Sequence, residues 1–315
     1  MSTMSDALAQ YLAVRRALGA KLSEPAVRLS HFVDFLKSQG AEFITTELAL
    51  RWAMQPKSAQ RGTWARRLSI VRRFAMWLNT DDPRTQVPPH RLIGGRRRRN
   101  PPHIYTDDEL ERLMAEASRL RSRRRLRART YTTIIGLLAA TGLRPGEVLA
   151  LTRSDVDLQN GILLIRESKF GKSRFVPIHA STRAALARYA KRRDELGLRL
   201  QAEAFFVAES GLPLQGSAVR RTFAKMSLAV GLRAPETGRR VGRGPRLQDF
   251  RHTFTTRKLI EWYRAGLDVE RELPKLSTYL GHSDVAHTYW YISADPELLQ
   301  LAQKVLCGRR PGGGK

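Results

Sequence analysis

The stretch "ATGLRPGEVLAL", residues 140–151, places an arginine at a corner between two helices. It overlaps the apolar run "TIIGLLAATGL", which is too short for a membrane helix and therefore predicts a buried helix ending at Thr141. Gly142 is a typical helix stop, and Pro145 suits the first position of a new helix. Arg144 is thereby held at the turn between the two helices, with Glu147 close behind it.

Two β-rich runs follow this corner. "GILLIRES" (161–168) and "RFVPIH" (174–179) are separated by "KFGK", whose glycine is typical of a hairpin loop. Most of the remaining sequence has helical periodicity, including Leu29, Phe32, Val33 and Leu36 at i, i+3, i+4 and i+7. We therefore expect a mainly α protein in which the second domain also carries a small antiparallel β-sheet.

The composition indicates a polyanionic partner. The chain has 315 residues, and 56 Lys+Arg stand against 29 Asp+Glu, which gives a net charge of +27. Nucleic acid is the polyanion that this excess favours. The single cysteine, Cys307, excludes an intramolecular disulfide and any zinc site built from several cysteines. There is no secretory signal and no apolar run long enough for a membrane, so we expect a cytoplasmic, nucleoid-associated protein without membrane contact.

The periodicity divides the chain into four parts. Residues 1–90 predict a helical DNA-binding domain, and residues 91–103 form a linker rich in Pro, Gly and Arg. Residues 104–306 form the second domain, and residues 307–315 are a tail that we expect to be disordered. A second helical stripe in the first domain, from Trp64 to Leu78, leaves basic residues on its other faces. The DNA-contact candidates are Arg66, Arg67, Arg72 and Arg73 in this helix, Arg96, Arg97, Arg98 and Arg99 in the linker, and Lys172 and Arg174 near the hairpin.

Four segments of the second domain carry residues suited to phosphate chemistry. Besides Arg144 in the corner, "SKFGKSRFVPI" (168–178) places Lys169 at the hairpin tip. "LQDFRHTF" (247–254) puts Gln248 and Arg251 three residues apart, on one face of a helix. "LGHSDVAHTYWYI" (280–292) places His282 just after an expected helix end and two tyrosines beyond it. Each segment alone is a weak signal, but their order and context form a specific combination.

This combination resembles the tyrosine recombinases, the phage-integrase family that includes the Xer-type enzymes. The likeness covers residues 104–306, and more loosely the first domain, which looks like the helical core-binding domain of that family. The resemblance implies that Arg144 and Arg251 are the two catalytic arginines, with Glu147 supporting the first. It also implies that Lys169 is the hairpin lysine and that His282 fills the second histidine position. The family nucleophile lies nine residues after that histidine, at Tyr291 rather than Tyr289.

Elementary chemistry is consistent with this set of residues. A phenol can attack a phosphodiester and conserve the bond energy in a covalent link to the phosphate. Two fixed arginines stabilise the charge on the phosphate without a metal. A lysine or histidine can protonate the leaving 5′ oxygen. The chain has no nucleotide-binding loop, and we expect neither a metal nor any other cofactor. Gln248 departs from the family pattern, which has histidine there; a glutamine amide can donate a hydrogen bond but cannot exchange a proton near neutral pH.

The resemblance implies a site-specific DNA recombinase or integrase of a mobile element. It would work through a 3′-phosphotyrosine, with two domains clamped around duplex DNA and four protomers on two sites. Related recombinases and accessory factors are further possible partners. Two alternatives stay open: a type IB topoisomerase-like enzyme, and a catalytically impaired, site-specific DNA-binding protein.

Overall fold

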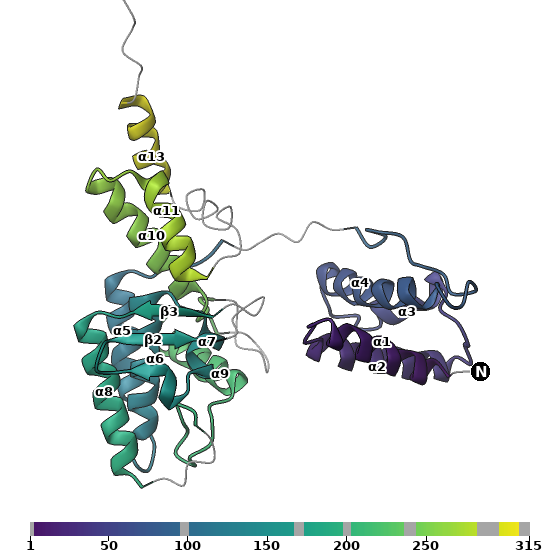
Figure 1. The fold of residues 1–315 in the computed structure, drawn as a ribbon, viewed down its shortest axis with the longest axis horizontal. Coiled ribbons are helices and arrows are strands. Elements are labelled where there is room, and N and C mark those ends of the chain that lie inside the picture. The colour runs from purple at the N-terminus through teal and green to yellow at the C-terminus, as the bar shows by residue number, and fades with distance from the viewer. Residues whose placement is uncertain are drawn as a thin grey trace, which may run out of the picture. The chain divides into compact units, whose positions relative to one another are not determined.

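The computed structural model describes residues 3–94, 101–166, 173–197, 203–235, 244–281 and 296–308, without the side chains of 296 and 305–308. Its contacts divide the chain into two compact units, Met1–Asn100 and Pro101–Lys315. Most described residues are helical, and one small antiparallel sheet lies in the second unit (Figure 1). The expected mainly α class is confirmed. Within the described part of the chain, no helix has the length and apolarity to cross a membrane.

The first unit is a small helical bundle. Its described helices are α1 (Met4–Ala17), α2 (Ser23–Ser38), α3 (Thr46–Met54) and α4 (Arg61–Leu78). The predicted stripe of α2 is fully buried, and Phe32 packs edge-on against Trp52 of α3, with ring centroids 5.2 Å apart. In α4, the stripe from Leu68 to Leu78 is buried against the same core, as its helical spacing predicted.

The second unit begins with helices whose ends match the sequence signals. They are α5 (Asp107–Ser118), α6 (Leu126–Thr141) and α7 (Pro145–Ala150). Thr106 caps α5 in a capping box with Glu109. α6 ends at Thr141, where Gly142 adopts the left-handed conformation with φ +62°, and Pro145 opens α7.

A short 3-10 turn, Arg153–Asp155, leads into the sheet. The strands are β1 (Val156–Asp157), β2 (Ile162–Ile165) and β3 (Arg174–Pro177). They pair antiparallel in the order β1-β2-β3, with Leu163 opposite Val176, so the predicted hairpin is confirmed. The helices that follow are α8 (Ala180–Glu195), α9 (Gly216–Ala229), α10 (Asp249–Arg264), α11 (Val269–Leu280) and α13 (Pro296–Gly308).

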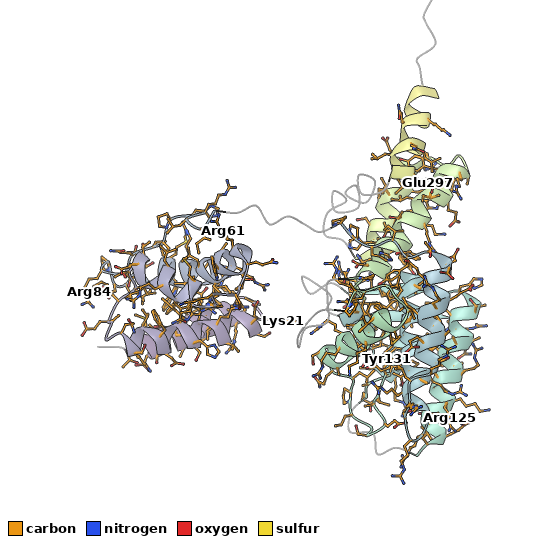
Figure 2. The ribbon with its side chains drawn as sticks, turned by 180° about the vertical axis from the view of Figure 1, so that it is seen from behind. Lys21, Arg61, Arg84, Arg125, Tyr131 and Glu297 are labelled. Carbon is orange, nitrogen blue, oxygen red and sulfur yellow. The ribbon has the colours of Figure 1, made fainter. Side chains whose placement is uncertain are left out.

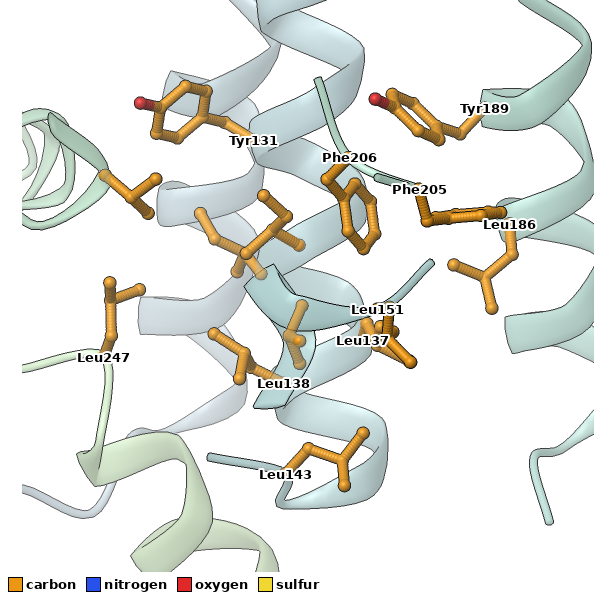
Figure 3. Close-up of a cluster of buried hydrophobic side chains, with 14 of the residues drawn as sticks. Tyr131, Leu137, Leu138, Leu143, Leu151, Leu186, Tyr189, Phe205, Phe206 and Leu247 are labelled. Atoms are coloured by element: carbon orange, nitrogen blue, oxygen red, sulfur yellow. The ribbon is translucent and has the colours of Figure 1, made fainter. Parts of the chain in front are cut away.

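One apolar core connects α5, α6, α8, α9 and the sheet. Figure 3 shows side chains of α6 and α8 converging on the aromatic pair Phe205 and Phe206. The Tyr189 hydroxyl in this core accepts a hydrogen bond from the Val207 amide at 3.1 Å, which satisfies its polar group. A smaller core packs α10, α11 and α13 together, with Leu298 fully buried. The two cores fix the elements that carry the candidate site.

Candidate active site

The corner between α6 and α7 requires a glycine. Gly142 has φ +62°, a region that other residues adopt only with strain. A Cβ atom there would lie 2.6 Å from the Phe254 ring carbon Cδ1, so α10 also packs directly against this glycine. The turn places Arg144 at the N-cap of α7, where its backbone amide donates to the Glu147 carboxylate at 3.0 Å.

Glu147 holds two guanidinium groups with one carboxylate. Its Oε1 accepts from Arg144 Nη1 at 2.7 Å, and its Oε2 accepts from Arg174 Nη2 at 2.9 Å. The carboxylate side chain is only 7% exposed. Burial raises the pKa of Glu147, but the hydrogen bonds and charges of Arg174 and Arg144 more than offset it and hold the pKa below its ordinary value. The acid is therefore ionised and fixes both arginines.

Arg174 occupies a different place from the one expected for a DNA contact. Its side chain is 10% exposed, and besides Glu147 it contacts the end of α11, where its Nε donates to the Tyr279 carbonyl at 2.8 Å. It also lies against Gly281, since a Cβ atom at Gly281 would be 2.7 Å from Arg174 Nη1. Arg174 thus links the hairpin, α7 and the end of α11.

That interior position had a signal in the sequence. Residues two apart in a strand share a face, and Val176, two residues after Arg174, is apolar and fully buried. Phe175 between them is 71% exposed. The alternation of β3 therefore directs Arg174 inward, towards Glu147.

Arg251 comes from α10 and is also buried. Its side chain is 1% exposed; Nη1 donates to the Gly142 carbonyl at 3.2 Å and Nη2 to the Leu280 carbonyl at 2.8 Å. Arg144 in turn donates from Nη2 to the Gly281 carbonyl at 3.2 Å. The two predicted catalytic arginines thus converge on the same end of α11.

Three successive carbonyls at the end of α11 each accept from a different arginine: Tyr279 from Arg174, Leu280 from Arg251 and Gly281 from Arg144. These carbonyls lie at the partially negative end of the helix dipole, which favours cationic partners. We call this arrangement the arginine cap of α11. It fixes three guanidinium groups around the point where the chain continues into residue 282.

Gln248 lies at the start of α10, as its N-cap residue. Its carbonyl accepts the Arg251 amide at 3.2 Å, so backbone bonding holds the two residues together. The following Asp249 is buried and forms an ion pair with Arg246 at 2.8 Å, which anchors the first turn of the helix. His252, next to Arg251, is half-buried, and desolvation lowers its pKa to about 4.

The other predicted site residues lie outside the described part of the chain. They are Lys169, Lys172, His282, Tyr291 and the linker arginines Arg96, Arg97, Arg98 and Arg99. Among described residues, no three His, Cys, Asp or Glu side chains gather as metal ligands. The described geometry therefore concerns Arg144, Glu147, Arg174, Gln248 and Arg251.

The four α4 candidates of the first unit differ in their surroundings. The Arg67 guanidinium stacks over the Trp52 ring at 3.8 Å and donates to the Trp52 carbonyl at 2.7 Å. Arg66 forms an ion pair with Glu24. Arg72 is half-buried beside Met76, whereas Arg73 is exposed. Arg67 therefore contacts residues of its own unit, whereas Arg66 and Arg73 are exposed.

Comparisons with known proteins identify the family of this chain. Residues 104–297 match the model of the phage integrase family. A putative integrase/recombinase of Sinorhizobium fredii, y4rB, is 44% identical over 97% of this chain and 98% of the relative. Tyrosine recombinase XerD of Caulobacter vibrioides is 28% identical over 98% of both chains.

Solved structures share the fold at lower identity. The Tn1549 transposon integrase in complex with transposon right end DNA aligns with a TM-score of 0.65 and 17% identity, covering 97% of this chain and 99% of that one. The XerA recombinase aligns with a TM-score of 0.51 and 22% identity, covering 98% and 100%.

The family match and the relatives show a DNA strand-transfer enzyme of the tyrosine recombinase class. The chain belongs to the phage integrase family. It is a DNA recombinase, and DNA is its partner. Family membership thus favours site-specific recombination over the two alternatives, a topoisomerase-like enzyme and an inactive DNA-binding protein.

Proposed function

We propose that this recombinase cuts and rejoins DNA through Tyr291, within a tetramer on two sites that belong to a mobile element. The arginine cap of α11 is the observation that carries the proposal. It holds Arg144 and Arg251 at the end of the helix that leads directly to His282, and Tyr291 follows nine residues later.

In this mechanism the two arginines bind the non-bridging oxygens of the scissile phosphate. Arg144 is 25% exposed, and its bonds to Glu147 and Gly281 use two of its five N–H groups. Two-pronged guanidinium contacts suit a phosphate whose negative charge grows during the reaction. Glu147 and Arg174 act through these arginines as positioning residues.

In the strand-cleavage step, the bond from phosphorus to the 5′ oxygen is replaced by a bond from phosphorus to the Tyr291 oxygen. The Tyr291 phenol oxygen attacks phosphorus, its proton passes to water, and the bond to the 5′ oxygen breaks while Lys169 protonates that oxygen. The product is a 3′-phosphotyrosine and a free 5′-hydroxyl. Gln248 donates a hydrogen bond to the phosphate in place of the family histidine, and His282 assists. A 5′-hydroxyl of the partner duplex then reverses the step.

The deciding experiment compares two tyrosine variants on a nicked suicide duplex that traps the covalent adduct. Tyr291→Phe should bind DNA normally and form no adduct, whereas Tyr289→Phe should form one at close to the wild-type yield. An adduct in the Tyr291→Phe protein would overturn the assignment. Strand exchange between two linear duplexes by the wild type then tests recombination against simple relaxation.

A further inference from the structure

A second basic surface lies at the far end of the catalytic unit. The segment 119–129, "RLRSRRRLRAR", connects α5 to α6 and includes the first turn of α6, and all of its arginines are exposed. They are Arg119, Arg121, Arg123, Arg124, Arg125, Arg127 and Arg129. Arg127 bonds inward to Thr222, at 3.2 Å. Within the described residues, Arg121, Arg123 and Arg124 have no carboxylate partner for their guanidinium groups.

The backbone beneath these arginines is held in place. The Arg124 amide donates to Glu209 Oε1 at 2.9 Å, and the Ser122 hydroxyl and the amides of Arg123 and Leu126 face the same carboxylate. Leu126 is fully buried, so the start of α6 is anchored in the core. Glu209 is bonded to the backbone, and among the described residues it forms no ion pair with Arg121, Arg123 or Arg124. The anchored loop therefore carries more positive charge than this one carboxylate can offset.

A cavity of about 590 Å³ adjoins this loop between α5, α6 and α8. Three arginines line it, Arg125, Arg129 and Arg188, together with five serine or threonine hydroxyls, the Tyr189 side chain and no carboxylate. The hydroxyl residues are Ser118, Thr132, Thr133, Ser181 and Thr182. The Thr132 Oγ1 atom is buried without a hydrogen-bond partner among the described residues. Guanidinium and hydroxyl donors together are the groups that bind phosphate oxygens.

The arginines of segment 119–129 are separate from the candidate active site. α6 has 16 residues and therefore spans about 24 Å, with Arg125 at its first end and the Arg144 corner at its other. Figure 2 shows Arg125 and Glu297 at opposite ends of the second unit, with Tyr131 of α6 between them. A phosphate held by Arg144 therefore cannot reach the arginines of segment 119–129.

We propose that this surface, which we call the remote arginine surface, binds the phosphate backbone of a second DNA segment. The arginines extend over eleven residues and onto α8, which is more than one free phosphate needs. An extended row of guanidinium groups matches a strand with one phosphate per nucleotide. The inference does not depend on Tyr291 being the nucleophile.

The test uses the full chain and a 25-base-pair duplex of unrelated sequence. The variant R121Q/R123Q/R124Q removes three charges from side chains that make no described bond. The control R153Q/K258Q/K275Q removes three charges from side chains paired with Asp194, Glu261 and Glu272. Fluorescence anisotropy gives the number of duplexes bound per chain and the salt dependence of binding. A nicked suicide duplex gives the adduct yield of each protein.

We expect the wild type and the control to bind two duplexes per chain, and R121Q/R123Q/R124Q to bind one. Each lost phosphate contact lowers the slope of log K against log salt by about 0.9, so three lower it by about 2.7. Adduct yields should be equal, because the altered arginines lie far from the active site.

If the variant keeps two duplexes and the wild-type slope, the inference is wrong. If a deoxynucleoside monophosphate displaces the second duplex at micromolar concentration, the cavity is a nucleotide site instead. Failure of every protein to form adduct counts against the proposed function only, since duplex binding is read separately.

Discussion

At the scale of single residues, the site depends on a buried carboxylate shared by two arginines. Glu147 and Arg174 are almost completely removed from solvent, and their two-pronged contact leaves each with a compensated charge. A buried charge that loses its partner destabilises a protein far more than an exposed one does. The same pair orients Arg144, so we expect its loss to affect both folding and cleavage.

Arg174→Ala should lower the free energy of unfolding by about 3–5 kcal/mol, the typical cost of breaking a buried ion pair. The matched control is Arg153→Ala, which removes an exposed pair with Asp194 and should cost about 0–1 kcal/mol. Urea denaturation measures both. Arg174→Lys should restore stability in part but cleavage poorly, because an ammonium cannot reproduce the fork-shaped contact. Equal losses for the Arg174 and Arg153 variants would contradict a structural role for Arg174.

His252 should make stability fall in mildly acidic solution. Its pKa is lowered from 6.5 to about 4 in the folded chain, mainly by desolvation. The unfolded state therefore binds a proton first, so the contribution of His252 is fully present above pH 6.5 and is lost as the pH falls from 6.5 towards 4. Melting temperatures of wild type and His252→Gln across this range provide the measurement. An unchanged acid slope in His252→Gln would show that another group titrates there.

At the scale of helices and strands, the end of α11 is the critical feature. Gly281 adopts φ +70°, and Gly266 at the end of α10 adopts φ +67°. A Cβ atom at Gly281 would collide with Arg174, whereas nothing lies within 4 Å of a Cβ atom at Gly266. The two glycines therefore share the same backbone strain but differ in their neighbours.

Gly281→Ala should reduce the rate of adduct formation by at least tenfold, while Gly266→Ala should leave it nearly unchanged. Both variants carry the left-handed strain of about 1–2 kcal/mol. Only the first displaces the guanidinium of Arg174 and with it the arginine cap. Single-turnover cleavage of the nicked duplex, with melting temperatures as a check on folding, compares the two. A similar rate for both variants would exclude the contact between Gly281 and Arg174 as the cause.

Local signals predicted these elements well, because helix periodicity and helix stops act over a few residues. The buried stripe of α2, the end of α6 at Gly142 and the start of α7 at Pro145 are all confirmed. The alternation of β3 could have indicated the inward direction of Arg174, but its pairing with Glu147 and the stacking of Arg67 on Trp52 depend on tertiary contacts that charge patterns do not reveal. The roles of Lys169, His282 and Tyr291 stay predictions that rest on the family motif.

At the scale of the whole molecule, the positive net charge is the main determinant of DNA affinity. The net charge of +27 is spread over both units, so DNA binding must release many counterions. Affinity for the target duplex should fall about 10³- to 10⁵-fold between 50 and 200 mM salt, as for a protein with 6–10 phosphate contacts. Anisotropy titrations over this range give the slope, and a change below tenfold would show that few phosphates are contacted.

The single unbroken helix α6 has a geometric consequence. It carries Arg125 at one end and leads into the Arg144 corner at the other, and its inner face is buried in the main core along most of its length. A helix packed in this way keeps a constant length, since interiors are dense and resist compression. Two DNA segments bound at its two ends would therefore be held at a fixed distance from each other, set by the length of α6.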